Sequence, residues 1–293
     1  DNLSQSTGNF YIKTSGLSTQ EWLPTSTTVL PPALQMWRDA PWQINGEIWL
    51  DWQGLETING IADLQINKLN ETTTNNNEVK KNDHGGRHNA VLPEHIQMLI
   101  SGNRNTQQQQ QLLIHNVSLQ HDEKNIALLN NLQIDYQADQ WHVRSPAVAL
   151  APLSDMAPFL PNEALHELLT SLHPTGFLRN LDITWDNSKP LLERMRLRAI
   201  ADNLNTGDWH GVPALTQVNG YLDSGIGYGF IDLESQHGFS MFYPSLYHEP
   251  LTFDQAAGRV QWEWQPDKKT VLVGSDYAAL TSTDGEARGN FWL

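Results

Sequence analysis

The residues with the greatest capacity for chemistry in this chain are histidines and carboxylates at short spacings. Glu163 and His166 lie three positions apart, with Glu167 beside the histidine. This spacing matches half of the Glu-x-x-His arrangement of di-iron helix bundles. The full site needs a second helical copy of the motif and two further glutamates on facing helices, and the sequence predicts no such helices. We therefore interpret these residues as the solvated face of a helix and expect no metal.

Two other stretches have the residue types of a binding site but not the spacing. His84 and His88 lie four positions apart, but Gly85 and Gly86 prevent the helix that would aim both imidazoles at one zinc ion. An adventitious metal site in a loop is the alternative there. Residues 225–229 are glycine-rich but lack the Lys and Ser or Thr of a phosphate-binding loop. A tight turn between two strands is the better interpretation.

Composition narrows the function classes further. The chain has no cysteine, which excludes disulfides, thiolate metal ligands and a cysteine nucleophile. Its net charge of −15 argues against nucleic acid, which needs clustered cations. Arg194, Arg196 and Arg198 are too few to reverse that conclusion and suit a solvated strand face. With no Gly-x-Ser-x-Gly elbow either, we expect no enzyme and no cofactor.

What remains is a set of elements in which apolar and polar residues alternate. Leu181, Ile183 and Trp185 alternate with polar residues, and Val260, Trp262 and Trp264 do the same. Side chains of a strand point to opposite faces with period 2, so each segment makes one apolar and one polar face. A long antiparallel sheet of such strands needs something to cover its apolar face. The eleven tryptophans are either core residues of that sheet or part of an apolar ligand surface.

We divide the chain into two segments, 1–150 and 151–293. In the first we expect a strand over 8–13, short helices over 18–23 and 33–37, and a hairpin over 44–69 that turns near Gly54. Residues 70–90 and 103–111 are rich in Asn and Gln and are expected to be insertions between strands. Further strands are expected over 96–100, 113–119, 132–136 and 141–143.

The second segment starts with helices and continues with strands. Residues 152–173 are expected to be helical, interrupted at Pro158 and Pro161, with one apolar stripe on the helix that follows Asn162. Gly176 then turns the chain. The remaining strands are expected over 177–187, 193–201, 217–224, 227–235, 238–243, 258–265, 270–275, 277–283 and 286–293. The fold class is therefore mainly β, with a few short helices.

Three blocks of the second segment resemble YhdP-like proteins of the AsmA-like group of bacterial envelope proteins. The first runs from Pro152 through the leucine stripe and Pro174-Thr-Gly176 to Trp185. The second is Gly211-Val-Pro213-Ala-Leu215, and the third runs from Glu249 through Phe253-Asp254 and Gly258 to Trp262. The first segment is similar more loosely, through Gly46-Glu-Ile-Trp49. The Asn-rich and Gln-rich insertions depart from the family pattern.

This resemblance implies a fold and a function that composition does not show. The group is built from a long, curved antiparallel sheet that forms an open groove with an apolar inner wall. It implies a periplasmic segment of an intermembrane lipid-transport protein, carrying phospholipid toward the outer membrane of a Gram-negative envelope. It also implies an anchor in the inner membrane, outside these residues. The partners would be phospholipid acyl chains and other envelope proteins.

We expect the groove wall to contain apolar residues from the alternating strands. They are Leu181, Ile183, Trp185, Leu197, Leu222, Met241, Trp262, Trp264, Leu280 and Phe291. The helix over 162–172 would cover the groove or cap an edge of the sheet. The alternative is a closed structural or adhesive β module of the envelope with the tryptophans in its core. Carbohydrate binding is a variant of this alternative, and it requires aromatic residues such as Trp49 or Trp292 on the polar face.

Overall fold

The fold is given by a computed structural model of the chain. It describes residues 6–18, 42–54, 57–68, 93–105, 109–121, 124–157, 163–209, 213–244, 248–265 and 270–292. The strands within them are β1 Thr7–Ser18, β2 Trp42–Gln53, β3 Thr57–Lys68, β4 His95–Arg104, β5 Gln110–His121, β6 Lys124–Gln137, β7 Gln140–Ala149, β8 Thr175–Asp186, β9 Met195–Thr206, β10 Ala214–Gly225, β11 Tyr228–Ser235, β12 Phe239–Phe242, β13 Leu251–Phe253, β14 Gln255–Gln265, β15 Thr270–Ser282 and β16 Gly285–Trp292. The helices are α3 Ala151–Met156, α4 Glu163–Leu172 and the 3₁₀ turn Leu191–Glu193.

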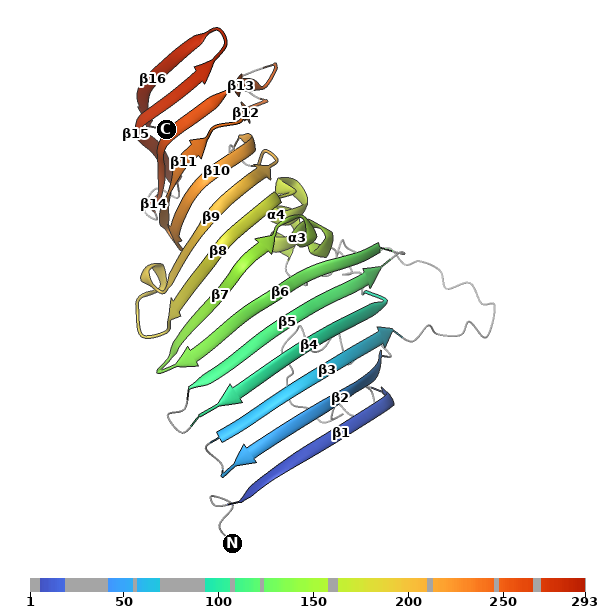
Figure 1. The fold of residues 1–293 in the computed structure, drawn as a ribbon. Coiled ribbons are helices and arrows are strands. Elements are labelled where there is room, and N and C mark those ends of the chain that lie inside the picture. Colours follow the sequence, from blue (N-terminus) through green and yellow to red (C-terminus); the bar gives the residue numbers. More distant parts are fainter. Residues whose placement is uncertain are drawn as a thin grey trace, which may run out of the picture.

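All strands belong to one long antiparallel sheet (Figure 1). Its order follows the chain from β1 to β11 and continues with β14, β15 and β16, while β12 and β13 extend the sheet beside β10. The strands at the two ends, β1 and β16, do not pair with each other. The sheet is therefore open, as the resemblance implied. It also runs across residue 150 without a break, because β7 pairs with β8, and the division into two segments stays a prediction.

The pairing register places apolar side chains on one face across strands far apart in sequence. One cross-strand row runs Leu50, Gly60, Gly102, Leu112, Ile134, Val143, Ile183 and Leu197. The neighbouring positions of the same strands form a polar row: Asp51, Asn59, Asn103, Gln111, Asp135, His142, Thr184 and Arg196. We call the first side the apolar face and the second the polar face.

The apolar face is packed at one end of the strands and open along the rest. A buried cluster joins strands β2 to β6 and consists of Trp42, Ile66, Ile96, Leu119, Ile126 and Leu128. Met156 of α3 packs against this cluster. Farther along the strands, Ile134, Val143 and Ile183 are only half-buried. A packed core therefore occupies the end near α3, and a half-exposed apolar surface continues from it.

The two helices lie in the connection between β7 and β8, at one end of the strands (Figure 1). The backbone N–H of Gly207 donates to the Leu172 carbonyl at 2.6 Å, which joins the end of α4 to the end of β9. Because β7 and β8 are in the middle of the sheet, the expectation that the helix over 162–172 caps a sheet edge is wrong. Of the two helices, α3 supplies the residue that packs on the core cluster.

Most of the expected elements are confirmed, including the strand over 8–13 and the hairpin over 44–69, and the differences have local causes. The insertion expected over 103–111 is shorter, because β4 continues to Arg104 and β5 begins at Gln110. The strands expected over 270–275 and 277–283 are one strand, β15. A register shift between Ser275 and Ala278 changes the phase of its alternation. The short strand β13 was not expected, and residues 18–23, 33–37 and 70–90 lie partly or wholly outside the described residues.

Candidate functional site

The ten residues expected in the groove wall are spread over six strands and the short strand β12. Leu181, Ile183 and Trp185 are in β8, Leu197 in β9, Leu222 in β10, Met241 in β12, Trp262 and Trp264 in β14, Leu280 in β15 and Phe291 in β16. Whether they bind a ligand stays a prediction, but the register decides which of them share a face.

Six of these residues follow one another across the apolar face. Ile183 lies directly opposite Leu197. Leu197 lies opposite Ser224, which is followed across the sheet by Gly229 and then Trp262. Side chains two positions apart on a strand point to the same side. The same face therefore includes Leu181 and Trp185, on either side of Ile183, and Leu222, two positions before Ser224. The apolar face thus continues from β8 to β14.

Of the remaining four residues, the register places two on the apolar face. Leu280 lies opposite Ala256, and Phe291 opposite Ser275, at positions that follow the apolar face through β15 and β16. Phe291 is 37% exposed. Trp264 lies opposite Val271, but its side chain is outside the described residues. Met241 pairs with Leu215 beyond two register shifts of β10, so the register does not assign it to either face.

The sequence analysis did not identify the residues that the first segment contributes to the apolar face. Leu50, Leu112, Ile134 and Val143 precede Ile183 in the same cross-strand row. The signal was available in the alternation of the 44–69 hairpin, but a pattern within one strand does not reveal the register between strands. The structure shows that both segments contribute to one continuous surface.

Aromatic side chains line one border of the apolar face. Tyr136 and Trp141 are opposite each other with ring centroids 4.6 Å apart, and Trp185 lies next to Trp141 across β8. The Tyr136 hydroxyl donates to Asp139 at 3.0 Å, and the Trp185 indole N–H donates to Asn187 at 2.8 Å. Tyr136 and Trp185 therefore each combine an apolar ring with a polar group that is hydrogen-bonded at a hairpin tip.

Two tryptophans of the apolar face lie over glycines of neighbouring strands. A Cβ on Gly8 would meet the Trp52 ring at 2.5 Å, and one on Gly229 would meet the Trp262 ring at 2.4 Å. Each tryptophan is directly opposite its glycine in the register. The absence of a side chain at each glycine thus leaves room for the tryptophan ring over the neighbouring strand.

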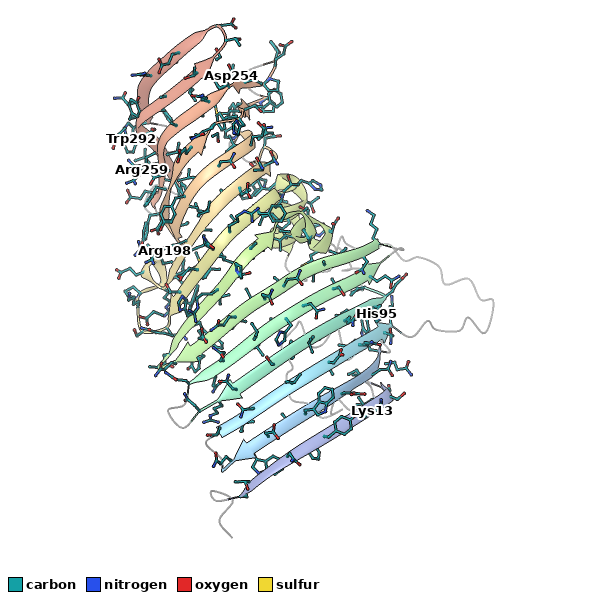
Figure 2. The ribbon with its side chains drawn as sticks, in the orientation of Figure 1. Lys13, His95, Arg198, Asp254, Arg259 and Trp292 are labelled. Atoms are coloured by element: carbon teal, nitrogen blue, oxygen red, sulfur yellow. The ribbon has the colours of Figure 1, made fainter. Side chains whose placement is uncertain are left out.

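The polar face is held together by cross-strand pairs of arginine and aspartate. Asp232 accepts two hydrogen bonds from Arg259, at 2.6 and 2.7 Å. Arg196 likewise donates twice to Asp223, at 3.0 and 2.7 Å. Figure 2 shows Arg198 and Arg259 on the strands of this half of the sheet. The hydrogen bonds from Arg196 lower the pKa of Asp223 against the opposing effect of burial, and those from Arg259 do the same for Asp232.

The chemical candidates of the sequence analysis have other roles. His166 Nδ1 lies 2.8 Å from the Ala157 carbonyl oxygen, and His84 and His88 are outside the described residues. Gly225 ends β10 and Tyr228 begins β11, which confirms the tight turn. Arg194 precedes β9 and donates to the Lys189 carbonyl, so only Arg196 and Arg198 share the strand face. Among the described residues no group of three or more His, Asp or Glu is arranged to hold a metal.

The length and composition of the helices decide whether any of them could span a membrane. In the part of the chain that it describes, no helix has both the length and the apolar composition to cross a bilayer.

Comparison with known proteins places the chain in a family. No curated protein and no solved structure matches it. The YhdP protein family matches residues 1–291, which is nearly the whole chain. The match includes the first segment and both insertions, where the resemblance was weaker. The chain therefore belongs to the YhdP family of AsmA-like envelope proteins.

Proposed function

We propose that this segment carries phospholipid through the periplasm, with the acyl chains bound to the apolar face of the sheet. The observation that supports the proposal best is the row of apolar residues and glycines from Leu50 to Leu197, which continues past Ser224 and Gly229 to Trp262. An acyl chain needs a continuous apolar path because every interruption would expose methylene groups to water, at about 0.8 kcal/mol each. This path crosses strands rather than following one.

The open form of the sheet supports the same proposal. A closed adhesive module would bury its apolar face, whereas Val143, Ile183 and Leu197 are half-buried. The aromatic border formed by Tyr136, Trp141 and Trp185 suits a boundary between acyl chains and a polar headgroup. Transfer along such a surface requires no covalent step, so the proposed function assigns no catalytic residue.

Family membership supports an envelope location, and we propose that the segment lies in the periplasm of a protein anchored in the inner membrane. Other envelope proteins would then be its partners at either membrane. The direction of transfer would be toward the outer membrane, as the resemblance implied.

Native mass spectrometry with lipid extraction tests the proposal. The chain is purified in mild detergent from a bacterial host, together with the variants Ile183→Asp and Thr184→Asp. These neighbours on β8 lie opposite Leu197 and Arg196 respectively, so they are on different faces. We expect phospholipid on the wild type and on Thr184→Asp, and its loss from Ile183→Asp, because a carboxylate interrupts the apolar path.

Circular dichroism of both variants provides the control for folding. A lipid-free wild type would contradict the proposal. The same conclusion would follow if a folded Ile183→Asp variant kept its full lipid content.

A further inference from the structure

The polar face has a feature that acyl-chain binding does not explain, namely exposed aromatic rings. Trp49 is 41% exposed and Tyr11 is 51% exposed. They are directly opposite each other on β2 and β1, with ring centroids 5.5 Å apart. Leu50, the neighbour of Trp49, points to the apolar face. An exposed aromatic pair on the water-facing side of a sheet contributes little to the core.

A trough runs from Trp49 across the polar face of the sheet, with Ile61 and Leu113 among its bordering residues. A depression of about 270 Å³ is bordered by Trp49, Asp51, Asn59, Ser101, Asn103 and Gln111, among others. A second depression of about 480 Å³ shares Asn103 and Gln111 with it and extends to Asp135, His142 and Arg144. The two shared side chains join the depressions into one trough that crosses β2 to β7.

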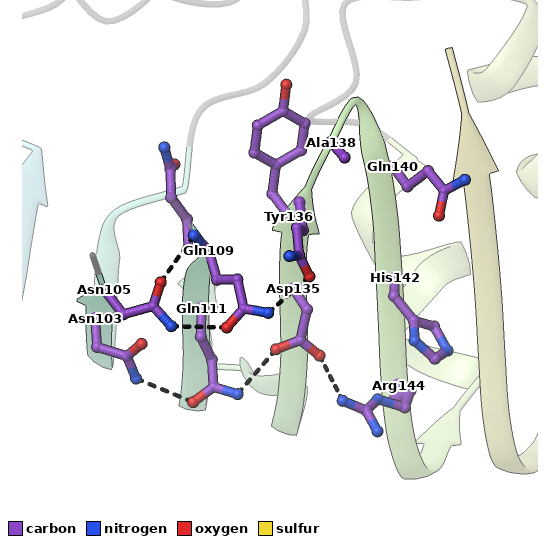
Figure 3. Close-up of a pocket in the computed structure, with 12 residues that line it drawn as sticks. Asn103, Asn105, Gln109, Gln111, Asp135, Tyr136, Ala138, Gln140, His142 and Arg144 are labelled. Carbon is purple, nitrogen blue, oxygen red and sulfur yellow. Dashed lines mark hydrogen bonds and ion pairs between the residues drawn. The ribbon is translucent and has the colours of Figure 1, made fainter. Parts of the chain in front are cut away.

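The trough is rich in carboxamides whose hydrogen-bonding capacity is partly unused. Asn103 donates to Gln111 at 3.0 Å, and Gln111 donates to Asp135 at 2.8 Å (Figure 3). A carboxamide has two donors and a carbonyl oxygen. Within the described part of the chain, the Asn59 side chain makes no hydrogen bond and Asn103 makes only the one to Gln111. Donors and acceptors therefore remain available to a ligand.

Near the carboxamides, the Asp135 carboxylate is paired with Arg144, whereas Asp51 adds a negative charge that has no ion pair in the described part of the chain. Arg144 donates to Asp135 at 2.5 Å, and His142 is 2.9 Å from Asp182. Burial would raise the pKa of Asp135, but hydrogen bonds from Gln133, Gln111 and Arg144 outweigh it and lower that pKa. The ionised carboxylate thus has its counterion in place. Such a surface favours an uncharged ligand over a phosphate or a nucleic acid.

We propose that this trough binds a glycan chain that carries acetamido groups. Trp49 would stack on the apolar face of a sugar ring, and the carboxamides of Asn59, Asn103 and Gln111 would pair with hydroxyl and acetamido groups. Neighbouring strands are about 4.8 Å apart, close to the length of one sugar unit. Successive sugars would therefore meet equivalent positions of successive strands. This site is on the opposite face from the proposed lipid path and does not depend on it.

Isothermal titration calorimetry with the β-1,4-linked hexamer of N-acetylglucosamine tests the proposal. The wild type is compared with Trp49→Ala, Gln111→Leu and Trp141→Ala. Trp141 is the matched control because it is 42% exposed but lies on the apolar face. We expect Trp49→Ala and Gln111→Leu to weaken binding at least about tenfold, and Trp141→Ala to leave it unchanged.

Two further titrations test the role of the acetamido groups and the independence of the two faces. Cellohexaose, which has the same linkage without acetamido groups, should bind more weakly than the N-acetylated hexamer. Ile183→Asp should bind the N-acetylated hexamer like the wild type, because the trough and the lipid path lie on opposite faces. A wild type that gives no heat with millimolar hexamer would overturn the proposal, as would equal losses in Trp49→Ala and Trp141→Ala. Equal affinity for the two hexamers would overturn the assignment to acetamido groups.

Discussion

At the scale of single residues, Asp223 shows how the polar face accommodates charge. Asp223 is only 7% exposed, and Arg196 donates two hydrogen bonds to its carboxylate. Arg198 adds a second positive charge at 3.8 Å. Because the pKa of Asp223 is lowered in the folded chain, its ionised form stabilises the fold.

Asp223→Asn is therefore expected to lower the free energy of unfolding at pH 7 by about 1–2 kcal/mol, a modest value because Arg196 is half-exposed. The contribution of a carboxylate with a lowered pKa is present above its unfolded value of 3.8 and is lost as the pH falls through the folded value. The difference in the free energy of unfolding between wild type and variant should thus become smaller from pH 7 to pH 3. Urea unfolding at both pH values measures it.

Asp232→Asn is the control for this prediction. Asp232 is paired with Arg259 in the same way, but its side chain is 42% exposed. Its replacement should therefore lower the free energy of unfolding by less than Asp223→Asn does. The prediction would be contradicted if wild type and Asp223→Asn differed in free energy of unfolding by the same amount at pH 7 and pH 3. The ionised carboxylate would then not be the source of the difference.

At the scale of elements, the alternation of apolar and polar residues was sufficient to predict most strands. Ile183 and Trp185 lie in a regular part of β8, whereas Leu181 falls within a register shift between Arg179 and Asp182. Alternation failed at Ser275, where an irregularity changes the phase within β15. It also could not reveal that Ile134 and Ile183 belong to one row, because register depends on pairing between strands. The apolar-face residues of the first segment were missed for this reason.

Gly176 is the element-scale position that is most sensitive to substitution. It is the second residue of β8 and has φ +94°, and a Cβ there would lie 2.2 Å from the Asn203 carbonyl oxygen. Gly176→Ala combines backbone strain with a clash against backbone atoms, and we expect it to cost about 2–3 kcal/mol of stability. Thermal and urea unfolding of the variant check this value.

Gly289→Ala is the matched control, since a Cβ at this position of β16 meets nothing within 4 Å. It should change stability by no more than about 0.5 kcal/mol. Equal stability of the two variants would contradict the structural role assigned to Gly176.

At the scale of the whole molecule, the open sheet separates two surfaces that a closed fold would not offer together. Its apolar face has a packed core near Met156 and a half-exposed row that includes Ile183. Its polar face has paired charges and the trough beside Trp49. Composition predicted neither surface, because both depend on the register of the strands. The resemblance to YhdP-like proteins predicted the open sheet, and the pairing order confirms it.

The binding of acyl chains to the apolar face can be measured by site-specific labelling, since the chain has no cysteine of its own. Single-cysteine variants Ile183→Cys and Thr184→Cys are labelled with bimane and mixed with phospholipid that has a nitroxide on its acyl chain. The two labels are adjacent in β8 but on opposite faces. We predict strong quenching at 183 and weak quenching at 184, because only the first label would lie beside the acyl chains. Equal quenching at both positions, or none at 183, would contradict the proposed lipid path.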